Sequence, residues 1–269
     1  MLNPAGGGWP RIESATERKG DVVEIWAHRG AKAEAPENTL AAFAVAIDVG
    51  ADGIEFDVQL SSDGYPVVIH DETLERTTNG HGWVKDHTLA ELLALDASGG
   101  ADGFAGESIP RLEQVLALVA PTPLRVNIEL KNSEIDYPGL EEAVLAAVAE
   151  AGMSRRAVYS SFSADSVRRL VALAPDAEVS LIYSRPLIRP LRTAEALGAS
   201  GLHPDRRLFR GAGWVRRAHL RKLAVRVWVA NTAERMTTLI RADVDGFFTD
   251  DPRLAVRVRD AVMGSLASP

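Results

Sequence analysis

The chain alternates short apolar segments with longer amphipathic segments from residue 22 almost to its end. Short apolar runs are typical of buried strands, and apolar residues three or four positions apart are typical of helices that cover a sheet. The strand-like segments are residues 22–28, 53–60, 66–70, 124–130, 157–161, 178–183, 201–203, 225–230 and 246–249. The helix-like segments are residues 37–49, 88–95, 111–119, 138–151, 163–173, 189–197, 212–222, 232–241 and 252–262. Because such an alternation joins parallel strands through helical crossovers, the sequence predicts an α/β fold.

The number of candidate strands favours a TIM-type (β/α)8 barrel. There is one segment more than this barrel needs, and residues 66–70 follow a turn at Asp63-Gly64 too closely for a parallel crossover. We therefore expect residues 66–70 to form a hairpin strand at the rim. An open, doubly wound sheet is the alternative, but the Gly-x-Gly-x-x-Gly turn expected after its first strand is absent. We predict one barrel domain at residues 21–264, with a small insertion that caps it at about residues 71–110.

Composition excludes several kinds of site. The chain has 269 residues, of which 46% are hydrophobic and 25% are charged, as in soluble globular proteins. The absence of cysteine excludes disulfides, thiolate metal sites and a cysteine nucleophile. A net charge of −7 argues against a nucleic-acid partner. The arginine-rich stretch 185–226 is interpreted as solvated helix faces.

The ends and hydropathy of the chain bear on its location. No run approaches the roughly 18 apolar residues that a membrane span requires, so we expect no stable membrane insertion. Residues 1–20, with Gly6-Gly7-Gly8, are expected to form a flexible leader that lacks the apolar core of a signal peptide. We therefore expect a cytoplasmic protein, and the sequence leaves its oligomeric state open.

Two acidic residues stand at alternate positions of one apolar strand, Glu55 and Asp57 in the segment Gly53–Val58. Side chains at positions i and i+2 of a strand point to the same face, so both carboxylates share the face opposite Ile54 and Phe56. Neighbouring carboxylates in a buried strand are unfavourable unless a cation neutralises them. The pair therefore predicts a divalent cation site, and a solvated edge strand with an acidic outer face is the alternative.

A histidine follows the predicted hairpin. If Asp63 and Gly64 are the two loop residues, the residue numbers of cross-strand partners sum to 127, which pairs Asp57 with His70 on the same face. A longer loop would shift this register. The turn therefore predicts that an imidazole lies beside the acidic pair.

Polar side chains recur at the carboxyl ends of the predicted strands, where barrels of this type carry their functional residues. These residues are His28, Arg29, Glu55, Asp57, His70, Asp71, Glu129, Lys131, Ser161, His203, Trp228, Asn231, Thr249 and Asp250. Glu55, Asp57 and Glu129, completed by waters and substrate oxygens, would form a six-coordinate oxygen site for Mg²⁺ or Ca²⁺. Zinc is disfavoured because the acids outnumber the imidazoles and no His-x-x-x-His helix is present.

Positive charge beside the acids indicates a phosphate substrate. The guanidinium of Arg29 suits a pair of phosphate oxygens, and Lys131 lies two positions after Glu129. A hard metal with an arginine, a lysine and two histidines indicates phosphoryl transfer. The alternative is an ion-pair network that only neutralises the acids, although such a network would not need histidines at strand ends.

These residues resemble those of the glycerophosphodiester phosphodiesterases, in order along residues 24–260. The matching motifs are His28-Arg29-Gly30, Pro36-Glu37-Asn38-Thr39, Glu55-Phe56-Asp57-Val58, Val67-Val68-Ile69-His70-Asp71, Asn127-Ile128-Glu129-Leu130-Lys131, Ser160-Ser161-Phe162, His203-Pro204 and Val244-Asp245-Gly246. The resemblance implies a (β/α) barrel that uses a divalent cation, Mg²⁺ or Ca²⁺ with Mn²⁺ as a further candidate, to hydrolyse glycerophosphodiesters to glycerol 3-phosphate and an alcohol.

The resemblance also implies roles for individual residues. It makes Glu55, Asp57 and Glu129 metal ligands, His28 and His70 the acid–base pair, and Arg29 and Lys131 the phosphate-binding residues. Glu37, His203 and Trp228 become candidate supporting residues, with capping of the helix at 37–49 as the alternative for Glu37.

Departures from the family pattern leave the alcohol open. His203-Pro204 is followed by Asp205-Arg206-Arg207, where the family more often has an aromatic residue or another histidine, and Val227–Asn231 lacks a common threonine. A lysophospholipase D-like enzyme would use the same site on a lipid, with exposed apolar residues such as Trp83 and Phe104 near the cap. A sugar isomerase barrel does not account for the two cations, and a non-catalytic phosphate-binding barrel would tolerate the loss of a catalytic residue, which is not seen.

Overall fold

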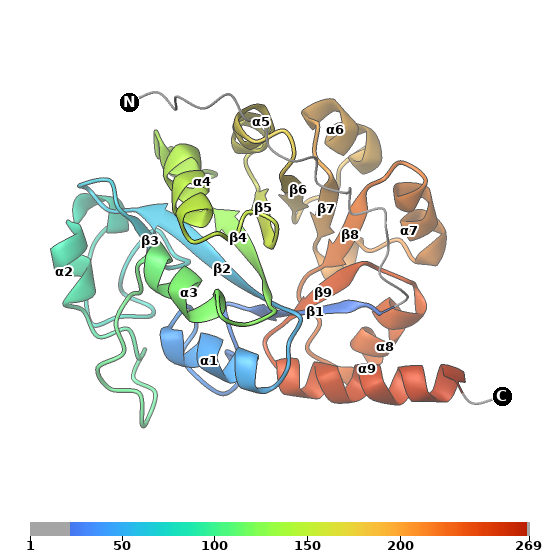
Figure 1. The fold of residues 1–269 in the computed structure, drawn as a ribbon, viewed down its shortest axis with the longest axis horizontal. Coiled ribbons are helices and arrows are strands. Elements are labelled where there is room, and N and C mark those ends of the chain that lie inside the picture. Colours follow the sequence, from blue (N-terminus) through green and yellow to red (C-terminus); the bar gives the residue numbers. More distant parts are fainter. Residues whose placement is uncertain (1–21, 268–269) are drawn as a thin grey trace.

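Eight parallel strands close into a barrel in the computed structural model, which describes residues 22–267 (Figure 1). The barrel strands are β1 (Glu24–His28), β2 (Gly53–Leu60), β4 (Arg125–Leu130), β5 (Ala157–Ser161), β6 (Glu178–Tyr183), β7 (Gly201–Pro204), β8 (Ala224–Val227) and β9 (Gly246–Thr249). β1 pairs in parallel with both β2 and β9, which closes the ring. The predicted TIM-type (β/α)8 barrel is confirmed, and the predicted leader at residues 1–20 lies outside the described residues.

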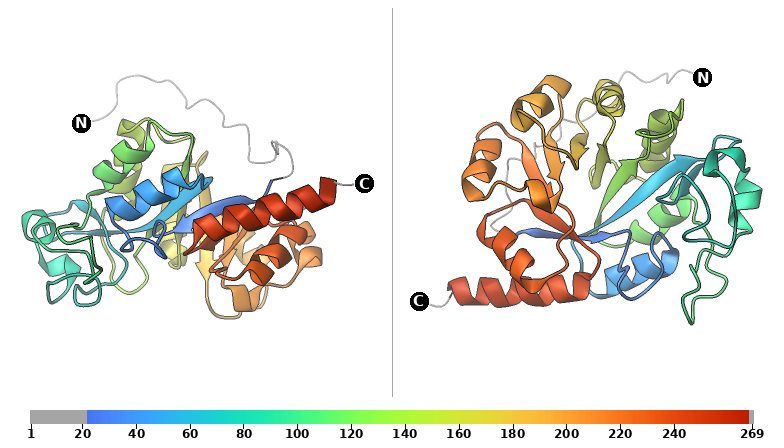
Figure 2. Two further views of the ribbon diagram at one scale, coloured as in Figure 1. Left: turned by 90° about the horizontal axis from the view of Figure 1, so that it is seen from below. Right: turned by 180° about the vertical axis from the view of Figure 1, so that it is seen from behind.

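Helices follow most of the strands and surround the barrel (Figure 2). They are α1 (Leu40–Asp48), α2 (Leu89–Leu93), α3 (Leu112–Val119), α4 (Leu140–Glu150), α5 (Ala164–Leu173), α6 (Pro190–Leu197), α7 (Ala212–His219), α8 (Ala233–Arg241) and α9 (Pro252–Ala267), with 3-10 turns η1 (Val84–Asp86) and η2 (Arg206–Leu208). Several begin at hydroxyl caps, since the side chains of Thr39, Ser163 and Thr232 accept hydrogen bonds from first-turn amides. No helix among residues 22–267 is long and apolar enough to cross a bilayer.

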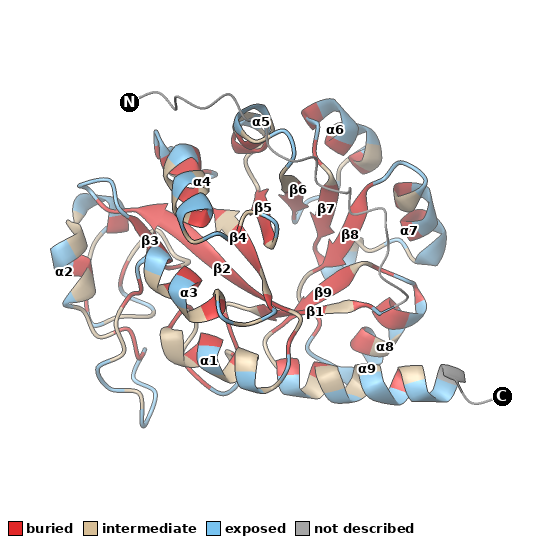
Figure 3. Ribbon diagram, viewed as in Figure 1, coloured by how far each residue is buried: buried red, intermediate tan, exposed pale blue. Residues whose placement is uncertain are grey.

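The outer face of the barrel forms the main hydrophobic core. Residues of β2 and β4 that alternate with the polar ones, such as Ile54, Phe56 and Ile128, are fully buried against the surrounding helices. Figure 3 shows the strands as a buried centre and the helices as half-buried, as amphipathic helices on a sheet should be. The opposite faces of the same strands point into the barrel and are polar.

The hairpin strand is present, but its predicted register is wrong by one residue. β3 (Pro66–Val68) pairs antiparallel with β2, and the register joins Val58 to Val68, so partner numbers sum to 126. The connection spans residues 61–65: the Ser61 amide donates to the Tyr65 carbonyl, and the Ser61 hydroxyl donates to Asp63. Asp57 therefore faces Ile69, whose amide donates to the Asp57 carbonyl, and not His70.

The segment from residue 71 to residue 110 packs beside the barrel around a small core of its own. Val67 and Ile69 contribute to this core from the hairpin, together with Leu74, Val84 and Leu92 from the segment. Figure 2 shows α2 on the opposite side of the barrel from α6 and α7. The bounds of most elements agree with prediction within a few residues; β8 ends at Val227 rather than at residue 230, and α1 begins after Thr39.

A charged ring lies inside the barrel near the amino ends of the strands. Glu24, Arg125, Glu178 and Arg226 come from β1, β4, β6 and β8, which are alternate strands of the eight. Each arginine bonds both glutamates, and both guanidinium groups stack on Trp26 at 5.4 and 5.3 Å from its ring centre. The ring and Trp26 fill this end of the barrel, so that the polar residues nearer the carboxyl ends stand above a closed floor.

Candidate active site

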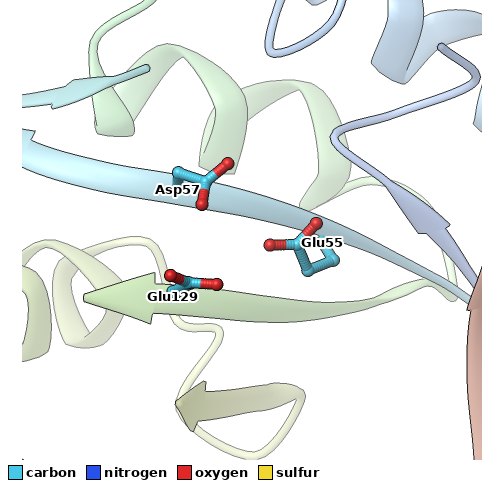
Figure 4. A group of neighbouring side chains, drawn as sticks. All are labelled: Glu55, Asp57 and Glu129. Carbon is cyan, nitrogen blue, oxygen red and sulfur yellow. The ribbon is translucent and has the colours of Figure 1, made fainter. Parts of the chain in front are cut away.

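Three carboxylates meet inside the barrel above this floor (Figure 4). Glu55 and Asp57 come from β2 and Glu129 from β4, and the sheet register places Asp57 beside Glu129. One oxygen from each lies within 4.8 Å of the others, and both β2 carboxylates are buried. The shared face predicted for Glu55 and Asp57 is therefore seen, and the edge-strand alternative is excluded because β2 is paired on both sides.

Burial and charged neighbours shift the pKa of each of the three acids. Burial, with the fields of Asp57 and Glu129, raises the pKa of Glu55 well above its ordinary value. Burial also raises the pKa of Glu129, although Lys131 opposes the rise. For Asp57 the burial effect is outweighed by His70, Arg29 and Lys131, and the pKa falls. Three acids this close would lose most of their mutual repulsion if a cation lay between them.

A buried amide supports this interpretation. Asn127 lies beside Glu55 in the sheet register, and its side-chain oxygen is buried without a hydrogen-bond partner among the described residues. Its amide nitrogen donates to the Ser160 hydroxyl at 2.9 Å. The unsatisfied Asn127 oxygen and the three carboxylates together form a set of oxygen ligands that suits a hard divalent cation.

Each of the two predicted catalytic histidines is held by its own carboxylate. The His28 Nδ1 lies 2.7 Å from Asp250 Oδ1, and the His70 Nδ1 lies 2.6 Å from Asp71 Oδ1. A proton on Nδ1 shared with the carboxylate leaves Nε2 as the second reactive nitrogen. Burial lowers the pKa of His28 despite the hydrogen bond to Asp250, so His28 is neutral at neutral pH.

The two predicted phosphate-binding cations also reach the site. Arg29 has a left-handed backbone (φ 57°), its amide donates to Glu55 at 2.9 Å, and its Nε lies 3.3 Å from an Asp57 oxygen. Lys131 Nζ lies 3.3 Å from both Glu129 Oε1 and His70 Nε2. Both cations therefore stand beside the carboxylates and at least one of the histidines.

A cavity of about 100 Å³ opens among these residues. Its lining comprises His28, Arg29, Glu55, His70, Asn127, Glu129, Phe162, Ile182, His203, Trp228 and Phe248. The Phe162 and Trp228 rings meet edge to face at 5.7 Å, and the His203 ring meets Phe248 at 5.0 Å. The cavity therefore combines polar residues in or just after β1 to β4 with mostly aromatic and aliphatic residues in or just after β5 to β9.

The remaining predicted residues occupy the wall or the surroundings. His203 is buried, burial lowers its pKa well below the ordinary value, and its carbonyl accepts a hydrogen bond from Trp228 Nε1 at 2.9 Å. Glu37 lies outside the cavity lining and accepts a hydrogen bond from Arg29 Nη1 at 2.7 Å. Capping does not explain Glu37, because Thr39 caps α1.

Several polar residues of the site were not assigned a role from the sequence. Asp250 anchors His28, Asn38 Nδ2 donates to Asp57 at 3.0 Å, and Arg76 bonds both Glu37 and Asp71. Asp250 is among the polar residues that the sequence places at strand ends, but its pairing with His28 was not predicted, because His28 lies 222 residues earlier in the chain. Arg76 carries no comparable signal, since it belongs to an irregular segment.

This fold and site define a class of protein, the barrel enzymes that act on phosphate esters. Comparisons with known proteins agree, since the family model of the glycerophosphoryl diester phosphodiesterase family matches residues 28–254. A glycerophosphodiester phosphodiesterase of Caldanaerobacter subterraneus subsp. tengcongensis is 42% identical over 242 residues, which cover 87% of this chain and 96% of that protein. The chain belongs to the glycerophosphoryl diester phosphodiesterase family and is a phosphoric diester hydrolase.

Solved structures show the same architecture. The glycerophosphodiester phosphodiesterase of Agrobacterium tumefaciens superimposes with a TM-score of 0.77 at 34% identity, covering 87% of this chain and 99% of that chain. A phosphodiesterase of Oleispira antarctica, solved in complex with the product sn-glycerol-3-phosphate, has a TM-score of 0.79 at 31% identity, with 89% and 97% covered. The likeness therefore extends over most of the barrel.

Proposed function

We propose that this hydrolase cleaves glycerophosphodiesters to glycerol 3-phosphate and an alcohol, with a divalent cation at the three carboxylates and with His28 and His70 as the acid–base pair. The observation that carries the proposal is that both histidines line the cavity of the acids and that each is hydrogen-bonded to a separate carboxylate. A purely structural ion-pair network would need neither two oriented imidazoles nor a cavity.

The acids would hold the cation. Glu55, Asp57 and Glu129 offer carboxylate oxygens, which suit Mg²⁺ or Ca²⁺ and also accommodate Mn²⁺. When bound, the cation supplies positive charge that neutralises phosphate oxygens. The Arg29 amide and the Asn38 side chain each fix one carboxylate oxygen, which holds the acids in place.

Arg29 and Lys131 would bind the phosphate group. Arg29 Nε is buried and makes no hydrogen bond of its own among the described residues, so it can donate to a substrate oxygen. The Lys131 ammonium stands between Glu129 and His70. Charge-assisted hydrogen bonds from both cations would position the phosphorus near the imidazoles and stabilise the charge that develops on its oxygens.

The histidines would move the protons. One imidazole removes a proton at Nε2 from the attacking hydroxyl, and the other returns a proton to the departing alkoxide, so that the alcohol leaves neutral. Each transfer is worth roughly 10²–10⁴-fold in rate. The attacking hydroxyl belongs either to water or to the glycerol 2-position. The second route makes a cyclic phosphate that water must then open to glycerol 3-phosphate, and turnover of a 2-deoxy substrate would exclude this route.

The reaction is tested by measuring glycerol 3-phosphate release from glycerophosphocholine, first with EDTA and then with Mg²⁺, Ca²⁺ or Mn²⁺ restored. We expect release only with metal, and a fall of at least about tenfold in kcat for His28→Ala and for His70→Ala while metal binding survives. Release in EDTA would contradict the metal site, and full activity in either variant would contradict the acid–base pair. Lysophosphatidylcholine tests a lysophospholipase D-like activity, with choline release as the readout, because the other product of that reaction is lysophosphatidic acid and not glycerol 3-phosphate.

A further inference from the structure

The loops that follow β6 and β7 carry a concentration of positive charge. Between residues 184 and 217 the chain has eight arginines and two acids, whereas its overall net charge is −7. Six of these arginines are exposed on the two loops and on the beginnings of the elements that follow. They are Arg185, Arg189, Arg192, Arg206, Arg207 and Arg210. We call these six, together with Leu187 and Ile188, the basic rim.

The basic rim includes an exposed aliphatic tip. Ile188 is 95% exposed, more than any other large hydrophobic residue that the structure describes. The neighbouring Leu187 is half-buried, and its carbonyl accepts a hydrogen bond from Arg210 at 3.3 Å, which links the two loops. At this exposure Ile188 does not contribute to the core, and it lies next to Arg189 and three residues after Arg185 in the chain, so the loop presents an aliphatic group among positive charges.

The charges of the basic rim are largely uncompensated. Arg207 pairs with Asp205 at 2.8 Å, but the other five arginines form no ion pair with any of residues 22–267. The other acid of the stretch, Glu195, lies in the last turns of α6 and pairs with Arg221. The arginines do not stabilise their helices either: Arg189 and Arg192 flank the start of α6, where the helix dipole favours negative charge.

The basic rim adjoins the mouth of the catalytic cavity. Ile182 at the end of β6 and His203 in β7 line the cavity, and the two loops leave the barrel immediately after these strands. The Arg206 amide donates to the carbonyl of Trp228, another lining residue, at 2.6 Å. An extended anion that contacts the basic rim would therefore lie next to the opening through which a substrate enters.

We propose that the basic rim docks the enzyme on bilayers that contain anionic lipids, with Ile188 buried at the interface and the arginines on the headgroups. Cationic side chains with an aliphatic tip match a surface that is negative outside and apolar beneath. A nucleic acid would use the arginines but would leave Ile188 in water. Docking of this kind requires neither a membrane-spanning helix nor catalytic turnover. The docking proposal therefore does not depend on the proposed reaction.

The test is co-sedimentation of the full chain with phosphatidylcholine vesicles and with mixed phosphatidylcholine–phosphatidylglycerol vesicles. We expect binding to the anionic vesicles that weakens with added salt, and little binding to phosphatidylcholine alone. Ile188→Ser should weaken binding by about tenfold or more, and the triple variant Arg185→Gln, Arg189→Gln, Arg192→Gln by about a hundredfold, since each arginine near an anionic surface contributes roughly fivefold.

Matched controls lie at the opposite end of the barrel. Leu220 is 81% exposed before β8, so Leu220→Ser removes a comparable aliphatic group, and Arg216→Gln, Arg217→Gln, Arg221→Gln removes the same charge. Both controls should bind vesicles as the parent protein does. The proposal is overturned if the parent protein does not bind anionic vesicles at low salt, or if the basic-rim variants bind them as tightly as the control variants do. It is also overturned if Ile188→Ser has no effect while a single-stranded oligonucleotide competes, because the surface would then be a nucleic-acid site.

Discussion

The orientation of His28 depends on one carboxylate that is itself fixed. One carboxylate oxygen of Asp250 accepts a hydrogen bond from the Asn231 side chain at 2.7 Å, and the other lies 2.7 Å from His28 Nδ1. Burial would raise the pKa of Asp250, but His28 and Lys32 outweigh it and lower the pKa to about 2. Asp250 is therefore ionised at neutral pH and holds the Nδ1 proton of His28, which keeps Nε2 free to exchange a proton with substrate.

Asp250→Asn should lower kcat by about tenfold or more and leave KM nearly unchanged, because the amide no longer selects the productive tautomer. Steady-state kinetics on glycerophosphocholine measures this. The matched control is Asp245→Asn, since Asp245 pairs with His219 at 2.8 Å near the amino ends of the strands. That variant should lose stability and keep its kcat; equal losses of kcat in both variants would show that His28 does not depend on Asp250 for catalysis.

The sequence predicted which residues gather at the candidate site better than it predicted which of them pair with one another. Glu55 and Asp57 were predicted together because strand periodicity places them on one face, and Glu129 was added because it stands at the carboxyl end of another strand of the predicted barrel. The pairing of His28 with Asp250 and the apolar wall formed by Ile182 and Phe248 depend on barrel closure, which local periodicity does not encode. Their roles therefore required the structure.

At the scale of elements, one arginine of the segment between β3 and α3 ties two active-site loops together. Arg76 donates to both oxygens of Glu37 and to both oxygens of Asp71. Glu37 in turn accepts from Arg29, and Asp71 holds His70. Burial would raise the pKa of Glu37, but Arg76 and Arg29 lower it to about 2, so the bridge remains charged at neutral pH.

Arg76→Gln should therefore loosen both Arg29, the proposed phosphate ligand, and His70, one of the two proposed acid–base residues. We expect kcat/KM to fall by roughly tenfold, with contributions from both kcat and KM, and Arg76→Lys to recover only part of the loss because an ammonium lacks the bidentate fork. Arg221→Gln is the control, as it removes an exposed arginine paired with Glu195 away from the site. If Arg76→Gln matched this control in kcat/KM, the bridge would have no catalytic role.

The sequence predicted the boundaries of the strands and helices more accurately than the register of the β2–β3 hairpin. Residues 53–60, 157–161, 178–183 and 246–249 were predicted as they stand, because apolar runs between turn residues mark buried strands. The hairpin is present, but its predicted register was wrong because Asp63 is not a free turn residue: its Oδ1 accepts hydrogen bonds from the Ser61 hydroxyl and from the Leu89 amide. A contact with a distant segment thus selected the longer loop, and a slip of one residue followed.

At the scale of the whole molecule, the barrel interior is packed in layers. Trp26 is fully buried above the charged ring, and the neighbouring strands make room for it with Gly53 and Gly246. A Cβ on Gly53 would lie 2.5 Å from two Trp26 ring carbons, and one on Gly246 would lie 2.9 Å from the Glu24 carbonyl oxygen. These glycines are required by close approach and not by turn geometry.

Gly53→Ala should destabilise the fold by about 1–3 kcal/mol, because Trp26 cannot move without disturbing the charged ring. Urea unfolding measures the change. Gly213→Ala is the control, since Gly213 lies within α7 with nothing near its Cβ position, and alanine there should stabilise by roughly 0.5–1 kcal/mol. A Gly53→Ala protein as stable as the parent would show that Trp26 repacks freely.

The charged ring links the stability of the barrel to pH. Burial would raise the pKa of Glu178, but Arg226 and Arg125 outweigh burial and lower it to about 2, compared with an ordinary value of 4.5. A carboxyl whose pKa is lower in the folded state stabilises the protein above pH 4.5, and this stability, up to about 3 kcal/mol, is lost as the pH falls toward 2. The sequence interpretation of the arginine-rich stretch as solvated helix faces is wrong for Arg226, which lies in β8 and is only 2% exposed. Glu178→Gln should destabilise the barrel by about 3–5 kcal/mol at neutral pH, because the buried Arg226 and the half-buried Arg125 lose a counter-charge. The same variant should flatten the decline of the unfolding free energy between pH 4.5 and 2, because the carboxylate that acid would protonate is already absent. The control is Glu195→Gln, which removes a half-exposed acid and should keep the parent dependence of unfolding free energy on pH, measured by urea unfolding at each pH. If Glu178→Gln also kept the parent pH dependence, acid would unfold the barrel through other carboxylates.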